Sequence, residues 1–312
     1  MRWPILVAVA GLIVFSGVAF AILHNGAGAS HSFGLSAGDR LIDVGGYRLY
    51  LHCVGAGRPT VVMDAGLAYD HHTWDAVLPR VAATTRACSY DRAGYGLSDV
   101  GPRPRTSGQI ARELRTLLAR AREPSPYLLV GHSFGGENMR LYAYTSPREV
   151  AGLVFVDSGL DDFGYPRLPP KLQRYSQALV RSEVRQCASF GSGTCGEVAA
   201  TFESIAQVTA ARHSLGHVPL VVLVAGLRQL DDSSVPRDVV AGFNRVYRPL
   251  PEELVHLSTN GQCIVARRSY HVIQHDQPDA VIGAIKRVVA AVRQHRLLSS
   301  PSSPARECTG YA

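Results

Sequence analysis

Short apolar segments alternate with amphipathic segments along most of the chain. Residues 40–44 and 47–53 alternate apolar and polar positions, and Gly45 and Gly46 between them form a two-residue turn that tolerates positive φ. This pattern predicts a hairpin of two half-exposed strands. Residues 60–64 (TVVMD) are too uniformly apolar for a half-exposed strand and predict one covered on both faces. Further strands are predicted at residues 86–90, 127–130, 152–156, 219–225 and 262–266.

Helical periodicity fills the intervals between these strands. A helix is predicted at residues 74–83 and another at 106–121, where Thr106 and Gln109 have the spacing of a capping box. A last helix begins at Pro278 and carries an apolar stripe every three to four residues. Strands that alternate with helices predict an α/β fold with a doubly wound, mostly parallel sheet and an antiparallel edge at its start.

One interval, at about residues 158–217, interrupts this alternation. It holds no strand pattern, but two of its segments, RYSQALVRSEVRQ and EVAATFESIAQVTAARH, are typical of helices. The interval is too long for a simple connection and short for an independent domain. It therefore predicts a helical lid inserted over the carboxyl edge of the sheet, within a folded domain at residues 36–297.

The first 30 residues differ in kind from the rest. Arg2 is followed by an uncharged stretch from Trp3 to Leu23, close to the ~20 residues that cross a bilayer. This predicts a membrane anchor with the remaining chain outside the cytoplasm, although Ala27 to Ala29 also allow cleavage and secretion. Residues 24–36 have the composition of a tether, and residues 298–312 form a Ser/Pro-rich tail.

Net charge and cysteine content indicate which partners, which compartment and which metal sites to expect. The formal net charge is +7, but the arginines are scattered without a basic run, so no nucleic-acid partner is predicted. Six cysteines suit an oxidising compartment, with Cys187–Cys195 and Cys53–Cys88 as the favoured bridges and buried free thiols as the alternative. No C-x-x-C pair and no H-E-x-x-H motif occurs, so no metal site is predicted.

The candidate chemistry begins with GHSFGG at residues 131–136. A strand, Gly-x-Ser-x-Gly and then a helix form a nucleophile elbow, in which the serine adopts a strained backbone conformation that exposes its hydroxyl. Gly131 and Gly135 leave no Cβ where the helix and strand pass closely. Ser133 also lies at a helix N-terminus, where free amides favour developing negative charge. Ser133 is therefore the predicted nucleophile.

From about Arg40 to His295 the chain resembles the alpha/beta-hydrolase superfamily. The resemblance rests on GHSFGG, on SYDRAGYGLSD at residues 89–99 and on YHVIQHDQPDAVIGAI at residues 270–285. It is similar to the serine-hydrolase branch, whose members cleave small esters and related acyl compounds. Related dehalogenases and epoxide hydrolases carry aspartate at the elbow, and Ser133 argues against both.

The resemblance implies a histidine between the last strand and the last helix, which is His271. The family usually has Ser-Gly-His there, whereas this chain has Ser269, Tyr270 and His271. A histidine can take the proton of a serine that is a poor nucleophile by itself. His275 is the alternative base, and His132 is expected to pack rather than react.

The acid that orients this histidine has two candidate positions. Asp157 follows the predicted strand beside the nucleophile strand, and a rigid strand end holds an imidazole well. Asp231 and Asp232 follow the next strand, but Gln229 occupies the common Gly-x-x-Asp position. Asp157 is the favoured acid, with Asp232 or Asp231 as the alternative.

The remaining parts of an acyl-transfer site are backbone amides for the oxyanion. The resemblance assigns them to Phe134 and to Leu67, while Asp91 and Arg92 are expected to hold their loop together. The sequence thus predicts a serine hydrolase of a small acyl substrate, without a cofactor. The alternatives are a ligand-binding protein on the same fold, or the same triad used for carbon–carbon bond hydrolysis or perhydrolysis.

Overall fold

The computed structural model describes residues 36–159, 161–187, 191–227, 235–298 and 308. Its centre is an eight-stranded sheet in the order β1-β2-β4-β3-β5-β6-β7-β8. The strands β1 and β2 are antiparallel, β2 is antiparallel to β4, and all later pairs are parallel. The predicted α/β sheet with an antiparallel start is therefore confirmed.

The strands lie where the apolar pattern places them. Their bounds are β1 Asp39–Asp43, β2 Arg48–Val54, β3 Thr60–Asp64, β4 Ala87–Tyr90, β5 Tyr127–His132, β6 Val150–Val156, β7 Leu220–Ala225 and β8 Gly261–Ala266. Every residue of β3 and β5 is buried, whereas β1 is half-buried with an exposed end. Strand β3 thus has the coverage on both faces that its sequence predicts.

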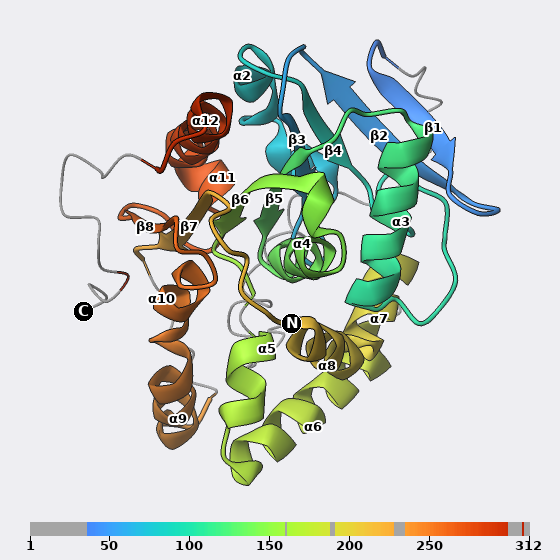
Figure 1. Cartoon of the computed structure of the whole chain (residues 1–312). Helices are drawn as coiled ribbons and strands as arrows, with labels where there is room; N and C mark the ends of the chain where they lie inside the picture. Colours follow the sequence, from blue (N-terminus) through green and yellow to red (C-terminus); the bar gives the residue numbers. More distant parts are fainter. Residues whose placement is uncertain (1–35, 160, 188–190, 228–234, 299–307, 309–312) are drawn as a thin grey trace.

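Helices cover both faces of this sheet (Figure 1). One core cluster joins alternate strand residues to α3 (Ser107–Arg120) and α4 (Phe134–Thr145), and the other joins the intervening residues to α2 (Leu78–Ala82) and α12 (Pro278–Gln294). Thus Leu129 packs toward α3 and α4, while Leu128 packs toward α2 and α12. The site described below lies where β5 passes into α4.

The helix predicted at residues 74–83 is wrong in extent. The chain forms a short 3-10 helix η1 at His71–Trp74 and then α2, which begins only at Leu78. Pro79 stands in the first turn of α2, where its fixed φ and missing N–H are tolerated. By contrast, Thr106 accepts a hydrogen bond from the Gln109 amide at 3.2 Å and caps α3, so half of the predicted capping box is confirmed. The Gln109 side chain bonds to Glu113 and Arg112 instead of the Thr106 amide.

Two helical insertions follow β6 and β7. Between β6 and β7 lie α5 (Asp161–Gly164), η3 (Tyr165–Arg167), α6 (Pro170–Gln186), α7 (Ser192–Ala199) and α8 (Thr201–Ala211). Between β7 and β8 lie α9 (Arg237–Tyr247) and α10 (Leu250–Val255), which the sequence pattern did not predict. Helices α5, α6 and α9 gather at the end of the molecule away from α2 and α12 (Figure 1).

Some predictions fall beyond the described part of the chain. The anchor and tether at residues 1–30 lie outside it, and so does the tail at 298–312 apart from Leu298 and Cys308. Within the described ranges, none of the helices has the length and apolar character needed to cross a membrane.

All six cysteines form disulfides. Cys53–Cys88 joins directly paired residues of β2 and β4, and Cys187–Cys195 joins the end of α6 to α7, so both favoured bridges are confirmed. Cys263–Cys308 ties β8 to the C-terminal region, a pairing that the sequence did not single out. Three disulfides indicate an oxidising, extracytoplasmic environment.

The two predicted bridges should differ in their effect on stability because they close loops of different length. The Cys53/Cys88 bridge spans 35 residues and the Cys187/Cys195 bridge spans 8. Loop-closure entropy predicts losses of about 4 and about 2.5 kcal/mol for replacing each pair by alanine. Urea unfolding of the two double variants would measure both losses. Equal losses would contradict this ranking.

Candidate active site

Ser133 lies between the last residue of β5 and the first residue of α4. Its backbone has φ 50° and ψ −125°, a conformation that a residue with a side chain rarely adopts. Three backbone hydrogen bonds hold it there: its N–H donates to Val156 O at 3.2 Å, and its carbonyl accepts from Gly136 N at 2.8 Å and Gly159 N at 2.9 Å. The strain is therefore offset by the neighbouring segments, and Ser133 is held beside the end of β6.

The glycines around Ser133 make this sharp turn possible. A Cβ at Gly131 would lie 2.5 Å from Gly136 Cα, and a Cβ at Gly135 would lie 2.5 Å from the carbonyl oxygens of Asp64 and Ala65. Such distances are too short for any side chain. The helix can leave the strand at this angle only because both positions lack a Cβ.

Asp157 and His271 form a hydrogen-bonded pair. His271 lies between β8 and α11 (Ile273–Asp276), and its Nδ1 is 2.8 Å from Asp157 Oδ2. The other carboxylate oxygen, Oδ1, accepts a hydrogen bond from Ala225 N at 2.9 Å. Asp157 itself has φ 38°, and its N–H donates to Leu223 O. One oxygen of the carboxylate is thus fixed by the end of β7 and the other by His271 in the loop after β8.

The tautomer of His271 in this pair follows from the chemistry of its partner. The Asp157 carboxylate can only accept a hydrogen bond when ionised, so Nδ1 of His271 carries the hydrogen. The neutral ring then has an unprotonated Nε2, which is the atom that a general base needs. Asp231 and Asp232, the alternative acids, lie outside the described residues.

Ser133 and His271 are linked through His132. The Nε2 of His132 donates to the His271 carbonyl at 3.0 Å, and the two imidazole rings lie 4.7 Å apart, centroid to centroid. Among the hydrogen bonds of the described residues, none joins the Ser133 hydroxyl to His271. The structure therefore brings the three residues to one edge of the sheet with only the His–Asp bond formed. In enzymes without substrate, such serine–histidine contacts are often long.

His132 is a packing residue that stays neutral. Its ring is fully buried and makes an edge contact with Tyr69 at 5.9 Å. Burial and the nearby His271 hold the pKa of the His132 imidazole well below its usual range. The alternative base, His275, lies 3.2 Å from the Thr73 hydroxyl. Neither the His132 ring nor the His275 ring forms the hydrogen bond to the Asp157 carboxylate that His271 forms.

The turn after β3 packs against the elbow. A Cβ at Gly66 would lie 3.2 Å from Ser133 Cβ and 2.8 Å from His132 Nδ1. Leu67, the next residue, is buried, and Phe134 begins the first turn of α4. The two backbone amides expected for the oxyanion thus belong to segments that flank Ser133.

Two carboxyl groups close to the elbow, the buried Glu137 and the half-buried Asp161, were not singled out from the sequence. Glu137 lies one turn along α4 from Ser133, and its Oε1 accepts a hydrogen bond from Asp161 N at 3.4 Å. Burial raises the pKa of Asp161 to about 7 and that of Glu137 well above its usual range. The Tyr247 hydroxyl of α9 donates to Asp161 at 2.8 Å, so this cluster joins both helical insertions to α4.

One group of residues has the spacing to hold a metal ion. Cys53, Cys88 and Glu123 are the only such group within the described ranges. Cys53 and Cys88 are joined as a disulfide, so they have no thiolate to offer as ligands.

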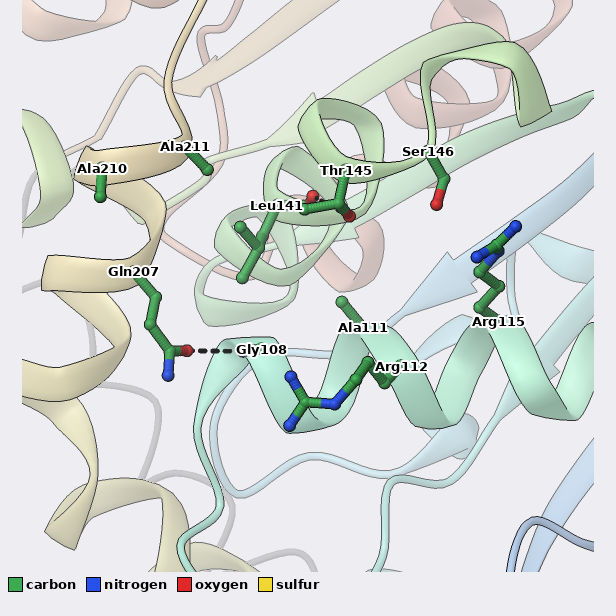
Figure 2. Close-up of a pocket in the computed structure, with 10 residues that line it drawn as sticks. All are labelled: Gly108, Ala111, Arg112, Arg115, Leu141, Thr145, Ser146, Gln207, Ala210 and Ala211. Atoms are coloured by element: carbon green, nitrogen blue, oxygen red, sulfur yellow. Dashed lines mark hydrogen bonds between the residues drawn. The ribbon is translucent and has the colours of Figure 1, made fainter.

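A groove of about 670 Å³ lies between α3, α4 and α8 (Figure 2). It runs along the C-terminal half of α4, away from Ser133 at the start of that helix. The Gln207 side chain of α8 accepts a hydrogen bond from Gly108 N at 2.8 Å across one end of it. Its other lining residues are Ala111, Arg112, Arg115, Leu141, Thr145, Ser146, Ala210 and Ala211.

Comparison with known proteins identifies the family. A profile of the Alpha/beta hydrolase family matches residues 49–284, from β2 into α12. The chain belongs to this family. It is 28% identical over 244 residues to the uncharacterized protein YqjL of Bacillus subtilis, which covers 78% of this chain and 88% of that protein. The elbow and the eight-stranded sheet are thus features of an alpha/beta hydrolase.

Solved structures support the same fold. The alpha/beta hydrolase chain is similar to a thermophilic esterase from Thermogutta terrifontis, with 22% identity, a TM-score of 0.53 and coverage of 79% of this chain and 94% of that one. It is also similar to a bromoperoxidase from Bacillus anthracis, with 16% identity, a TM-score of 0.57 and coverage of 81% and 99%. At these identities the likeness concerns the fold alone.

Proposed function

We propose that this alpha/beta hydrolase is a serine hydrolase that cleaves a small ester or related acyl substrate. The observation that carries the proposal is the hydrogen bond of 2.8 Å between His271 Nδ1 and Asp157, formed beside the strained elbow of Ser133. Family membership supports a hydrolytic activity, and the serine at the elbow favours an acyl-enzyme route.

In this mechanism His271 acts first as a base and then as an acid. Its Nε2 takes the hydroxyl proton of Ser133 as the oxygen attacks the substrate carbonyl, and Asp157 stabilises the imidazolium that forms. The amides of Phe134 and Leu67 donate to the oxyanion. Collapse of the tetrahedral intermediate expels the alcohol, which takes the proton from His271. Water then attacks the acyl-enzyme by the same steps and releases the acid.

The segment between β6 and β7 is proposed to be a lid on this site. Its helices α5 to α8 follow Asp157 directly in the chain, and its α7 contributes Glu197 to the buried polar groups near the elbow. A cover of this kind would exclude water and contact the acyl group. We assign residues 36–297 to the catalytic domain and about 158–217 to the lid.

The same proposal places the enzyme outside the cytoplasm. Its three disulfides suit an oxidising compartment, and the uncharged stretch from Trp3 to Leu23 has the length of a membrane anchor. We propose that this segment either tethers the enzyme to the membrane or is cleaved for secretion.

Hydrolysis of p-nitrophenyl esters would test the activity. We expect the acetate and butyrate esters to be hydrolysed, with an initial burst of one p-nitrophenol per enzyme when deacylation is slower than acylation. An octanoate ester would report how much acyl chain the site admits. Failure to hydrolyse any of them above the rate of Ser133→Ala, by protein that unfolds cooperatively, would contradict the proposal.

A further inference from the structure

Arg92, just after β4, is the most completely bonded charged side chain near the elbow. Its guanidinium side chain is 1% exposed, and all five of its N–H donors are used. Nε and Nη2 donate to the two carboxylate oxygens of Glu197 at 2.7 and 3.0 Å. Nη1 donates to Asp64 and to the Ala65 carbonyl, and Nη2 also donates to the Gly66 carbonyl at 2.9 Å.

The bond to Gly66 acts on the peptide group that carries the Leu67 amide. The carbonyl of Gly66 and the N–H of Leu67 belong to one planar unit and point in opposite directions when the peptide is trans. A guanidinium that holds this oxygen therefore fixes the direction of the Leu67 N–H. A charged donor on the oxygen also polarises the unit and makes its N–H a stronger donor.

Arg92 also contacts the residue that carries the second oxyanion amide. Its guanidinium carbon lies 5.6 Å from the centre of the Phe134 ring, within the range of a cation–π contact. Asp64, one of its carboxylate partners, accepts a further hydrogen bond from the Asn138 side chain of α4 at 3.1 Å. A single side chain thus fixes the turn at 65–67 relative to the first turns of α4.

Glu197 connects this arrangement to the segment between β6 and β7. It lies on α7, is 1% exposed, and accepts a third hydrogen bond from the Tyr95 hydroxyl at 2.7 Å. The Cys187–Cys195 disulfide fixes α7 two residues earlier. Through Glu197, α7 therefore holds one side of the Arg92 guanidinium, whose other side is bonded to Asp64 and the turn at 65–67.

Stability alone is a poor explanation for this cluster. Burying one guanidinium with two carboxylates carries a large desolvation cost, and well-packed apolar residues often stabilise a core as much or more. An apolar side chain at 92 would, however, leave the carbonyls of Ala65 and Gly66 without these donors. The guanidinium of Arg92 is therefore better explained by its hydrogen bonds to the carbonyls of Ala65 and Gly66.

We propose that Arg92 is a positioning residue that orients and polarises the Leu67 amide for the oxyanion, and that Glu197 couples this amide to the inserted helix α7. This inference rests on the proposed serine-hydrolase function. It predicts an effect on the transition state that exceeds the effect on substrate binding.

The test compares Arg92→Lys with Arg105→Lys in the full chain. Arg105 is also a buried guanidinium, 2% exposed, but it pairs with Glu113 of α3. Lysine keeps the charge and loses the planar fork in both variants. For Arg92→Lys we expect kcat on p-nitrophenyl acetate to fall about 10- to 100-fold, with KM within about threefold, because loss of one oxyanion donor costs about 100- to 1,000-fold. With the same substrate, Arg105→Lys should change kcat by less than about threefold.

A phenylboronic acid, which forms a tetrahedral adduct with an active serine, gives an independent readout. Its inhibition constant should rise for Arg92→Lys by the same factor as kcat falls, and it should not change for Arg105→Lys. If Arg92 had only a structural role, both variants would melt at a lower temperature, but the boronate inhibition constant would not rise by the factor by which kcat falls. A folded Arg92→Lys enzyme with unchanged kcat and boronate affinity would overturn the inference.

A second variant covers the case in which Arg92→Lys does not fold. Glu197→Gln keeps the size of the side chain but replaces one of the two Glu197 oxygens that accept from Arg92 by a donor. We expect a 3- to 10-fold fall in kcat, smaller than the fall expected for Arg92→Lys, with a matching loss of boronate affinity. Unchanged values here would also overturn the inference. A wild-type enzyme that hydrolyses no ester would instead contradict the proposed function itself.

Discussion

Replacement of His271 by alanine should lower kcat by about 10⁶-fold, the effect of removing the base from a Ser-His-Asp triad. Without the imidazole, nothing takes the proton of Ser133, and the Asp157 carboxylate loses the ring that it orients. Single-turnover hydrolysis of p-nitrophenyl acetate would measure the loss. Any residual rate would come from substrate binding and the oxyanion amides.

His275→Ala is the matched control for this experiment. His275 lies in the same loop, four residues along the chain, and contacts the Thr73 hydroxyl rather than the Asp157 carboxylate. We expect it to keep kcat within about tenfold, because a neutral hydrogen bond is worth about 1 kcal/mol and a tenfold change in rate needs about 1.4 kcal/mol. If His275→Ala were the inactive variant and His271→Ala the active one, the assignment of the base would be wrong.

Asp157→Asn should lower kcat by about 10⁴-fold while leaving the fold intact. The reason lies in the two partners of the carboxylate. Ala225 N–H needs an acceptor at Oδ1, so the new amide would turn its NH₂ group toward His271 Nδ1. That group can only donate, which forces the ring hydrogen onto Nε2. The imidazole could then no longer accept the Ser133 proton.

Asp232→Asn provides the comparison because Asp232 is, with Asp231, one of the two alternative acids that the sequence allows. We expect the steady-state kcat of this variant to stay within about threefold of the wild type, the scale of most substitutions away from a reacting group. The pH dependence of kcat/KM for both variants would show which carboxylate acts on the base. A larger loss for Asp232→Asn than for Asp157→Asn would move the acid to the later loop.

The fold was largely predictable because its strands carry strong local signals. Strand β3 is apolar throughout, and the hairpin β1–β2 has both its alternation and its glycine turn in the sequence. The helices α9 and α10 were not predicted. Yet the apolar residues of α9 recur at helical spacing and pack in one cluster (Val239, Val240, Phe243, Val246 and Tyr247), so the sequence did carry a signal for this helix. The Cys263–Cys308 pairing spans 45 residues and has no local pattern that could indicate it.

The candidate site was also predictable only in part. Ser133 and Asp157 could be proposed because each stands at the end of a strand whose pattern is clear. The bonding of Arg92 to Glu197 could not be, because these residues are 105 positions apart and meet only when α7 packs onto the loop after β4. The one available signal was a single acidic residue in the otherwise uncharged stretch TCGEVAAT at residues 194–201.

Labelling by a fluorophosphonate probe tests the central claim most directly, because the probe reacts with an activated serine rather than with an ordinary hydroxyl. Intact mass and peptide mapping should show one adduct on the wild-type chain, located on Ser133. The adduct should be absent from Ser133→Ala and from heat-unfolded wild type. A folded wild-type protein that stays unlabelled, or an equal adduct on Ser133→Ala, would contradict the account.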